Sequence, residues 1–283
     1  MPMNITIYLF LILSLGSCSK NVTADTTDAQ KISNVSYGAD ARQNMDIYLP
    51  ADRNSSTTPL AILIHGGGWS GGDKQDFGLF IMELQKRLPG YAIANINYRL
   101  ASNNNNLFPT QENDIKAAVE FLLNKSGEYK ISKQLVLIGA SAGAHLALLH
   151  SYKHNTNNSN IKAVVSLFGP TELVSLYNNA PNPNIPVLLT GVTGGTPASK
   201  ATIYQQSSPY NFVTAQSSPT LLFHGGNDPL VPVSQSTQLK DKLAANGVVN
   251  QYIFYPSEGH GWTGPNLTDT FNKIEVFLKQ QIP

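Results

Sequence analysis

The chain has 283 residues, of which 41% are hydrophobic and 13% charged, and its formal net charge is +1. This composition is typical of a globular protein and argues against disorder. The near-neutral charge and the lack of any lysine or arginine cluster give no reason to expect nucleic acid or a strongly acidic partner.

An apolar run over residues 5–15 lies at the N-terminus, broken only by Thr6 and Ser14. It is shorter than the roughly 20 residues needed to cross a bilayer, but it suits the apolar region of a signal peptide. Leu15-Gly16-Ser17-Cys18 follows and resembles a bacterial lipobox, in which the cysteine is lipidated and becomes the new N-terminus. Residues 1–18 are therefore predicted as a signal peptide with a lipobox.

Cys18 is the single cysteine of the chain, so no intramolecular disulfide can form. The four residues before the apolar run contain no lysine or arginine. The alternative is an ordinary cleaved signal with an incidental cysteine. Either way we expect an exported protein, whose only membrane contact would be an N-terminal lipid anchor. The polar residues 19–33 are predicted as a flexible tether.

Residues 34–283 are predicted to form a single domain in which strands alternate with helices. Alternation of this kind implies an α/β fold: a mainly parallel sheet covered by helices on both faces. The predicted strands are residues 35–37, 45–49, 60–64, 91–97, 135–138, 161–167, 220–223 and 252–255. The predicted helices are residues 115–123, 142–152, 234–245 and 268–280.

Two segments interrupt the alternation. Residues 100–107 contain four consecutive asparagines and are predicted as a loop. Residues 169–211 are rich in Pro, Gly, Asn and Ser and lie between two predicted strands. Ligands bind beyond the carboxyl ends of the strands in α/β sheets, and long loops there often cover the site. We therefore expect residues 169–211 to form a small cap over a substrate pocket.

Gly139-Ala140-Ser141-Ala142-Gly143 lies between a predicted strand and a predicted helix. This is the context of the G-x-S-x-G elbow, which presents a nucleophilic serine at the top of a sheet. The N-terminus of the helix behind it favours developing negative charge. Ser141 is thus the candidate nucleophile, and a glycine-rich turn with an incidental serine is the alternative.

His65-Gly66-Gly67-Gly68-Trp69 follows the strand predicted over residues 60–64. Attack on an ester places negative charge on the carbonyl oxygen, and glycines let backbone N–H groups approach it closely. The predicted oxyanion donors are the N–H groups of Gly67, Gly68 and Ala142. We expect His65 to bond the loop backbone and Trp69 to pack beside the site. No Lys-Ser or Lys-Thr pair follows the glycines, which argues against a phosphate-binding loop.

The general base is sought among six histidines. His260 lies between glycines just after the last predicted strand, where a loop side chain could reach the serine, take its proton and pass it to the leaving group. His150 and His154 have helical spacing that could serve a metal. No acidic residue or cysteine is near them in sequence, so we predict surface histidines and no metal site.

Asp228 follows the strand predicted over residues 220–223, in Gly226-Asn227-Asp228-Pro229, and precedes His260 in the chain. The order Ser, Asp, His is that of hydrolases with this elbow, in which the acid holds the histidine in one tautomer. Glu258 is the alternative acid, but it is too close in sequence to orient His260 easily. Asp114 is expected to be structural, paired with Arg99.

These motifs resemble α/β-hydrolase esterases, namely the hormone-sensitive-lipase-like group and the acetyl-xylan and feruloyl esterases. The match runs in family order over nearly all of the chain after residue 34. The matching stretches are Asp46-Ile47-Tyr48-Leu49-Pro50, His65 to Trp69 with Gly72-Asp73-Lys74, Asn97-Tyr98-Arg99-Leu100, Gly139 to Gly143, His224 to Pro232, and Gly259-His260-Gly261. Asp46-Ile47-Tyr48-Leu49-Pro50 and Gly71-Gly72-Asp73-Lys74 look most like the bifunctional feruloyl and acetyl-xylan esterases. One departure is Ala144, where many relatives have a second glycine, and residues 169–211 match poorly.

The resemblance implies an α/β-hydrolase fold and the triad Ser141, Asp228 and His260. The predicted activity is hydrolysis of short acyl esters, such as acetyl or feruloyl groups on polysaccharide, through an acyl-enzyme and without cofactor or metal. Two alternatives stay open: an amidase, formamidase or peptidase using the same residues, and a non-catalytic binding protein on the same scaffold.

Overall fold

The computed structural model describes residues 28–154 and 160–282. These residues form one eight-stranded sheet in the order β1-β2-β4-β3-β5-β6-β7-β8. β1 and β2 are antiparallel to their neighbours, and every pairing from β4 to β8 is parallel. The strands are β1 (Gln30–Ser36), β2 (Asn44–Leu49), β3 (Leu60–Ile64), β4 (Ala92–Ile96), β5 (Leu135–Ala140), β6 (Ile161–Leu167), β7 (Thr220–Gly225) and β8 (Asn250–Tyr255).

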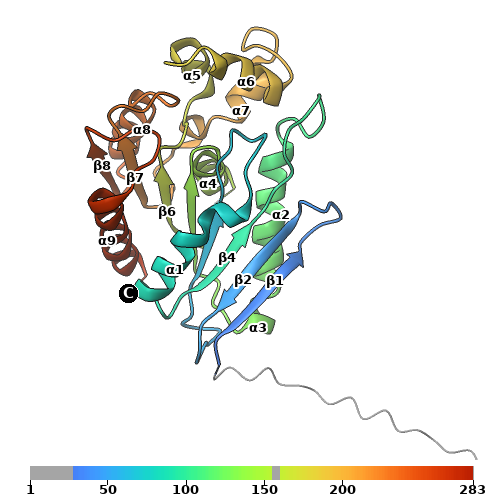
Figure 1. Cartoon of the computed structure of the whole chain (residues 1–283), viewed down its shortest axis with the longest axis vertical. Coiled ribbons are helices and arrows are strands. Elements are labelled where there is room, and N and C mark those ends of the chain that lie inside the picture. Colours follow the sequence, from blue (N-terminus) through green and yellow to red (C-terminus); the bar gives the residue numbers. More distant parts are fainter. Residues whose placement is uncertain (1–27, 155–159, 283) are drawn as a thin grey trace, which may run out of the picture.

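Helices cover both faces of this sheet (Figure 1). The helices of the described residues, including those of the cap, are α1 (Gly78–Arg87), α2 (Thr110–Asn124), α3 (Ser126–Tyr129), α4 (Ala142–Lys153), α5 (Leu173–Asn179), α6 (Asn184–Thr193), α7 (Ala201–Gln206), α8 (Ser234–Ala245) and α9 (Gly264–Gln281), with 3-10 turns η1 (Lys74–Phe77) and η2 (Pro209–Phe212). Among the described residues, no helix is both long enough and apolar enough to span a bilayer.

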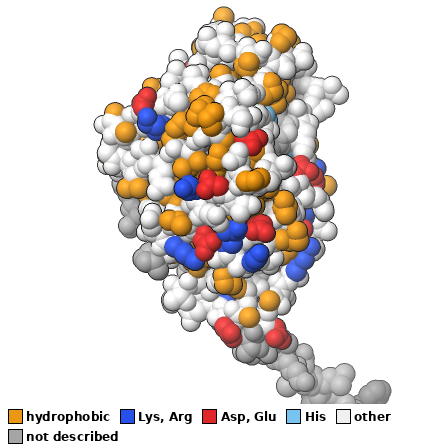
Figure 2. Space-filling model, turned by 60° about the vertical axis from the view of Figure 1, so that its left-hand side comes forward, with side chains coloured by type: hydrophobic (Ala, Val, Ile, Leu, Met, Phe, Trp, Pro, Cys, Tyr) orange, Lys and Arg blue, Asp and Glu red, His pale blue; other side chains and the backbone are white. Residues whose placement is uncertain are grey.

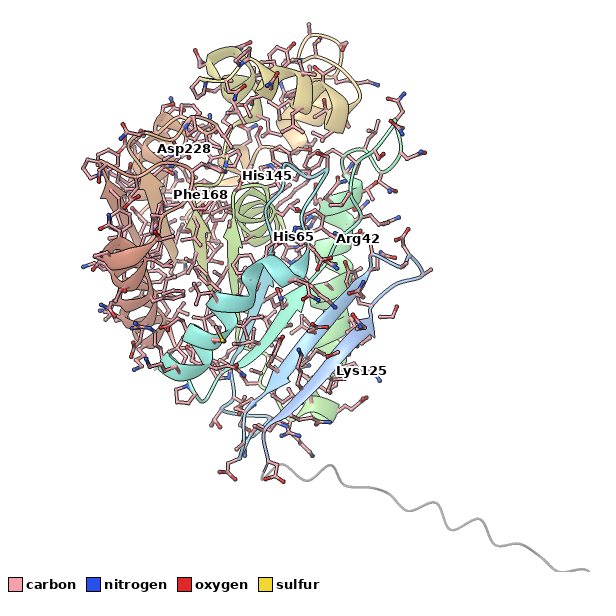
Figure 3. All side chains as sticks on the ribbon, viewed as in Figure 1. Arg42, His65, Lys125, His145, Phe168 and Asp228 are labelled. Carbon is pink, nitrogen blue, oxygen red and sulfur yellow. The ribbon has the colours of Figure 1, made fainter. Side chains whose placement is uncertain are left out.

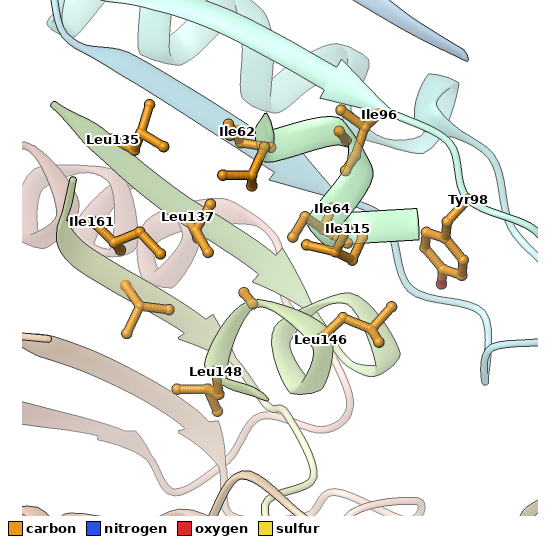
Figure 4. Close-up of a cluster of buried hydrophobic side chains, with 14 of the residues drawn as sticks. Ile62, Ile64, Ile96, Tyr98, Ile115, Leu135, Leu137, Leu146, Leu148 and Ile161 are labelled. Carbon is orange, nitrogen blue, oxygen red and sulfur yellow. The ribbon is translucent and has the colours of Figure 1, made fainter. Parts of the chain in front are cut away.

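Two buried clusters explain this layering. Side chains on one face of the central strands, such as Ile62 and Leu137, pack against α2 and α4 through Ile115 and Leu146 (Figure 4). Side chains on the other face pack against α1 and α9. β3 and β4 are buried along their whole length, as expected for parallel strands covered on both sides. The α/β-hydrolase architecture predicted from the sequence is confirmed.

Each predicted strand and helix is present. The bounds of β3, β6 and α8 are those predicted, the others have shifted ends, and β1 differs most. It begins at Gln30 and pairs with β2 from Gln30 opposite Leu49. The last residues of the predicted tether, 19–33, are therefore part of the sheet. The rest of that segment before residue 28, the predicted signal peptide and Cys18 lie outside the described residues.

The segment predicted as a cap connects β6 to β7 and contains α5, α6, α7 and η2. It is therefore largely helical, although its composition suggested a long loop. Figure 1 shows α5, α6 and α7 gathered at one end of the molecule, beyond the ends of the central strands. This is the end at which the parallel strands β3 and β5 deliver their carboxyl termini.

Candidate active site

Ser141 lies at the turn between β5 and α4, with φ 53° and ψ −120°. A non-glycine residue at positive φ is strained by about 1–3 kcal/mol, and such strain concentrates at functional sites. The turn is possible because its neighbours are small: a Cβ added to Gly143 would collide with the backbone oxygens of Ile64 and His65. The pentapeptide thus fixes the serine at the turn between β5 and α4, with the start of α4 packed against the end of β3.

The structure brings Ser141, His260 and Asp228 together from three segments. His260 Nε2 lies 2.8 Å from Ser141 Oγ, and His260 Nδ1 lies 2.8 Å from Asp228 Oδ2. An aspartate only accepts, so Nδ1–H donates to it, and Nε2 is left to accept the serine hydroxyl. The base therefore has the tautomer that proton removal from Ser141 requires.

Asp228 is held by two further hydrogen bonds. Its Oδ1 accepts from the backbone N–H groups of Leu230 (2.8 Å) and Val231 (2.9 Å). Burial raises the pKa of the carboxyl, but the hydrogen bonds from His260 and these backbone groups outweigh burial and lower it below its ordinary value. Asp228 is therefore an anion at neutral pH and can stabilise a protonated His260.

The other predicted acid and base candidates lie elsewhere. Glu258 accepts from Asn266 Nδ2 at 2.6 Å. His65 Nδ1 donates to the Gly66 carbonyl at 2.7 Å, and its ring stacks on Tyr98 at 4.3 Å, so it bonds the loop backbone as expected. Figure 3 shows His65, His145, Phe168 and Asp228 near the end of the sheet below the cap.

The paired histidines of α4 differ from the prediction in two respects. His150 is buried rather than on the surface, with 5% of its area exposed. His154 Nε2 lies 2.7 Å from Glu112 on α2, an acidic neighbour that was not apparent in the sequence because it comes from another helix. Within the described residues, no group of three or more His, Cys, Asp or Glu side chains is placed to hold a metal.

Gly67 and Gly68 form the loop opposite the elbow, with φ values of 103° and 58°. Both line a cavity of about 520 Å³ together with Ser141, Ala142 and His260. None of the hydrogen bonds found among the described residues uses the backbone N–H of Gly67, Gly68 or Ala142 as donor. These three groups are thus placed around the serine and are not committed elsewhere.

The remaining wall of the cavity is mostly apolar. It includes Trp69, Phe168 and three cap residues, Leu176, Ile185 and Leu188. A smaller hollow of about 180 Å³ adjoins it and shares Gly66, Asp76, Ala140 and Phe168. Phe168 has φ 47° and its ring centroid lies 4.5 Å from that of His260. Sequence reasoning missed Phe168 and the cap residues because no motif marks them.

Asp114 is structural, as predicted. Arg99 Nη2 lies 2.6 Å from Asp114 Oδ1, and Asp114 Oδ2 also accepts from the Arg99 backbone N–H at 2.8 Å. Gln43 Nε2 donates to the same carboxylate at 2.8 Å. This fully buried carboxylate ties α2 to the segment before β2 and to the segment after β4.

The fold and this arrangement define an α/β hydrolase with a Ser-His-Asp constellation below a helical cap. Residues 45–243 match the BD-FAE family, and the chain belongs to it. It is also similar to Esterase LipC of Mycobacterium tuberculosis, with 24% identity over 87% of this chain and 64% of the relative. The Probable carboxylic ester hydrolase LipM of the same organism is 28% identical over 74% of this chain and 51% of the relative. The chain thus spans about half to two thirds of the length of these curated relatives.

The chain is also similar to solved structures of carbohydrate esterases. A truncated form of a carbohydrate esterase from gut microbiota has 25% identity and a TM-score of 0.75, covering 91% of this chain and 98% of that one. A bifunctional GH43-CE protein of Bacteroides eggerthii has 25% identity and a TM-score of 0.77, covering 89% of this chain and 38% of that one. The predicted resemblance to the acetyl-xylan and feruloyl esterase group is therefore confirmed.

Proposed function

We propose that this protein is a serine esterase that cleaves carboxylic esters through an acyl-enzyme. The observation that carries the proposal is the pair of 2.8 Å contacts that joins Ser141, His260 and Asp228. The relatives named esterase or carboxylic ester hydrolase support it.

In this mechanism Ser141 Oγ attacks the ester carbonyl while His260 Nε2 takes the hydroxyl proton. The N–H groups of Gly67, Gly68 and Ala142 bind the oxygen that becomes negative. His260 then gives its proton to the leaving alcohol oxygen, and the acyl group remains on Ser141. Water repeats the sequence with the same proton transfers and releases the acid.

Hydrolysis of p-nitrophenyl acetate by residues 19–283 tests the proposal, with Ser141→Ala as the matched variant. We expect a rapid rate that falls by several orders of magnitude in the variant, because the nucleophile is lost. Equal, slow rates for both proteins would contradict it.

We further propose short acyl esters of polysaccharide, acetyl or feruloyl, as the substrates. Membership in the BD-FAE family and the two carbohydrate-esterase neighbours support this. So does a cavity of about 520 Å³ whose wall is mostly apolar. Release of acetate from acetylated xylan and of ferulate from methyl ferulate, each compared with Ser141→Ala, tests it. Activity on p-nitrophenyl acetate alone would restrict the proposal to simple esters.

A peptidase or amidase is the second candidate, because the chain is 26% identical to Dipeptidyl aminopeptidase BIII of Pseudoxanthomonas mexicana over 78% of its length. It covers only 33% of that protein. Matched p-nitrophenyl acetate and p-nitroanilide substrates separate the two. A higher kcat/KM on the anilide would favour the amide reaction.

We also propose that the protein is exported and anchored through a lipid on Cys18. The apolar run over residues 5–15 and the lipobox-like Leu15-Gly16-Ser17-Cys18 support this. Mass spectrometry of the N-terminal peptide from the membrane fraction tests it, with Cys18→Ser as the control. We expect a diacylglyceryl-modified cysteine, and release of the protein from membranes in Cys18→Ser.

A further inference from the structure

His145 is buried without exposed area on α4, one turn after the nucleophile, and takes no part in the triad. It makes two side-chain hydrogen bonds. Its Nδ1 lies 3.2 Å from Trp69 Nε1, and its Nε2 lies 2.6 Å from the Ser207 carbonyl oxygen. The ring therefore touches the glycine loop on one side and the cap segment on the other.

The two partners leave only one protonation state for this ring. The Trp69 indole can only donate, so Nδ1 must accept, and the Ser207 carbonyl can only accept, so Nε2–H must donate. His145 is thus neutral, with its proton on Nε2. Burial lowers the pKa of His145 to about 4, which agrees with this state.

Trp69 is a residue that needs such a restraint. It has φ 59° and follows Gly67 and Gly68, which also have positive φ. A bulky side chain in this region is strained and persists only when its surroundings enforce it. Besides the bond to His145, the indole packs edge-on against the rings of His145 (5.1 Å) and Phe108 (5.7 Å).

The cap also contacts the loop of residues 66–69 and the segment beside it. A Cβ added to Gly68 would lie 2.9 Å from Leu188 Cδ2 of α6. The Phe108 backbone N–H donates to the Val192 carbonyl of α6 at 2.9 Å. The position of the cap and the conformation of residues 66–69 are therefore linked at several points. Among the described residues, His145 is the one side chain that hydrogen-bonds both.

We propose that His145 is a positioning residue for the oxyanion donors. By accepting the indole N–H it holds Trp69 at positive φ, and so aims the backbone N–H groups of Gly67 and Gly68 at the position of the substrate carbonyl oxygen. By donating to Ser207 it fixes the cap to the same point. This inference rests on the proposed esterase activity.

Two substitutions separate these hydrogen bonds. His145→Asn places an amide oxygen near the position of Nδ1, so it keeps the acceptor for Trp69 and loses the donor to Ser207. His145→Gln places an amide nitrogen near the position of Nε2, so it keeps the donor and loses the acceptor. Trp69→Phe removes the indole N–H itself. His150→Gln is the matched control, because His150 is a buried histidine of the same helix that lies away from the loop.

We expect His145→Gln and Trp69→Phe each to lower kcat on p-nitrophenyl acetate about 10- to 100-fold, with KM within about threefold. Displacing an oxyanion donor weakens binding of the transition state more than binding of the substrate. Both changes remove the same hydrogen bond between Trp69 and His145. The double variant should therefore lose no more kcat than either single variant. His145→Asn should keep kcat within about threefold of the wild-type value, and His150→Gln should leave kcat unchanged.

Equal losses in His145→Asn and His145→Gln, or a change confined to KM, would overturn the proposal. The Trp69 indole N–H resonance, assigned by its absence in Trp69→Phe, gives a readout that does not need activity. It should shift in His145→Gln and stay near its wild-type position in His145→Asn. An inactive wild type would refute the esterase proposal, whereas an unshifted indole resonance in His145→Gln would refute the positioning role on its own.

Discussion

Asp228 shows how the environment of one residue sets its role. Its side chain has no exposed area, yet its pKa lies below the ordinary value because donors from three residues face its two oxygens. Oδ1 is bound by the backbone N–H groups of Leu230 and Val231, and Oδ2 faces His260. This division leaves one oxygen free to orient the histidine and keeps the carboxylate rigid.

Asp228→Asn should lower kcat about 10⁴-fold, because a neutral amide cannot stabilise the protonated histidine and can bind the wrong tautomer. The measurement is steady-state hydrolysis of p-nitrophenyl acetate at pH 7. Glu258→Gln is the control, since Glu258 bonds Asn266 and is expected to leave kcat within about twofold. The opposite ranking of the two variants would move the role of acid to Glu258.

Gly68→Ala should lower kcat/KM about 10- to 100-fold, because the added Cβ would meet Leu188 and would sit at a φ of 58°. Both effects shift the loop that carries the proposed oxyanion donors. Gly71→Ala is the matched control from the same loop, since its Cβ would meet only the Gly67 carbonyl, at 3.5 Å. Equal activity in the two variants would show that the loop tolerates a side chain at Gly68.

At the scale of elements, the central strands could be predicted because burial on both faces leaves continuous apolar runs. Helix α1 could not. Only Ile81 and Leu84 are buried in it, while Leu79 and Met82 are 52% and 62% exposed, so its apolar residues do not follow one helical face. The cap helices are short, and α6 contains Pro186 and Gly191, which read as loop signals.

The same contrast holds for the candidate site. Ser141, Asp228 and His260 could be placed from sequence because each lies in a glycine-rich turn directly after a predicted strand. The Trp69–His145 bond could not, because it joins residues 76 apart in the chain and depends on how α4 packs against the loop. The pairing of His154 with Glu112 escaped prediction for the same reason.

Element η1 is anchored by a buried ion pair that the Gly-Gly-Asp-Lys motif supplies. Lys74 Nζ lies 2.6 Å from Asp46 Oδ1 on β2 and also donates to Asn34 (2.8 Å) and Asn44 (2.7 Å). Only 3% of its side chain is exposed. All three ammonium protons thus have acceptors, and the segment after the glycine loop is fixed to the edge of the sheet.

Lys74→Met should lower the free energy of unfolding by about 3–5 kcal/mol, because it leaves Asp46 buried without its partner. Urea denaturation followed by circular dichroism measures the loss. The double variant Lys74→Met/Asp46→Leu should recover part of it, since no charge is then left unpaired. The recovery should be incomplete, because Asp46 Oδ1 also accepts from the Asn34 backbone N–H at 2.8 Å and Asp46→Leu removes that bond. A double variant less stable than Lys74→Met would show that this hydrogen bond matters more than the unpaired charge.

For the whole molecule, charge is balanced on the surface, and the charges inside, such as Lys74 with Asp46, are paired. The face shown in Figure 2 carries acidic and basic side chains interspersed with hydrophobic ones. Several charges of the described residues are paired, as in Arg87 with Glu83 and Glu275. Inside, burial lowers the pKa of His65, His145, His150 and His224, so these histidines are neutral in the folded protein.

Acid should therefore destabilise this protein well above the pH at which carboxylates titrate. Burial lowers the pKa of His145 to about 4 and that of His150 to about 3, from an ordinary value of 6.5. The unfolded chain binds these protons below pH 6.5, whereas the folded chain does not until the lowered values are reached. The free energy of unfolding is therefore undiminished by these histidines above pH 6.5, and it falls progressively as the pH falls toward 4.

Between pH 7 and pH 5 we expect each of these two histidines to reduce the free energy of unfolding by about 2 kcal/mol. Urea denaturation at the two pH values measures the difference. His150→Gln cannot bind a proton in either state, so its own stability should depend less on pH, by about 2 kcal/mol over this interval. An undiminished pH dependence in His150→Gln would mean that the folded protein binds a proton at His150 as readily as the unfolded chain does, so that burial does not lower the pKa of His150.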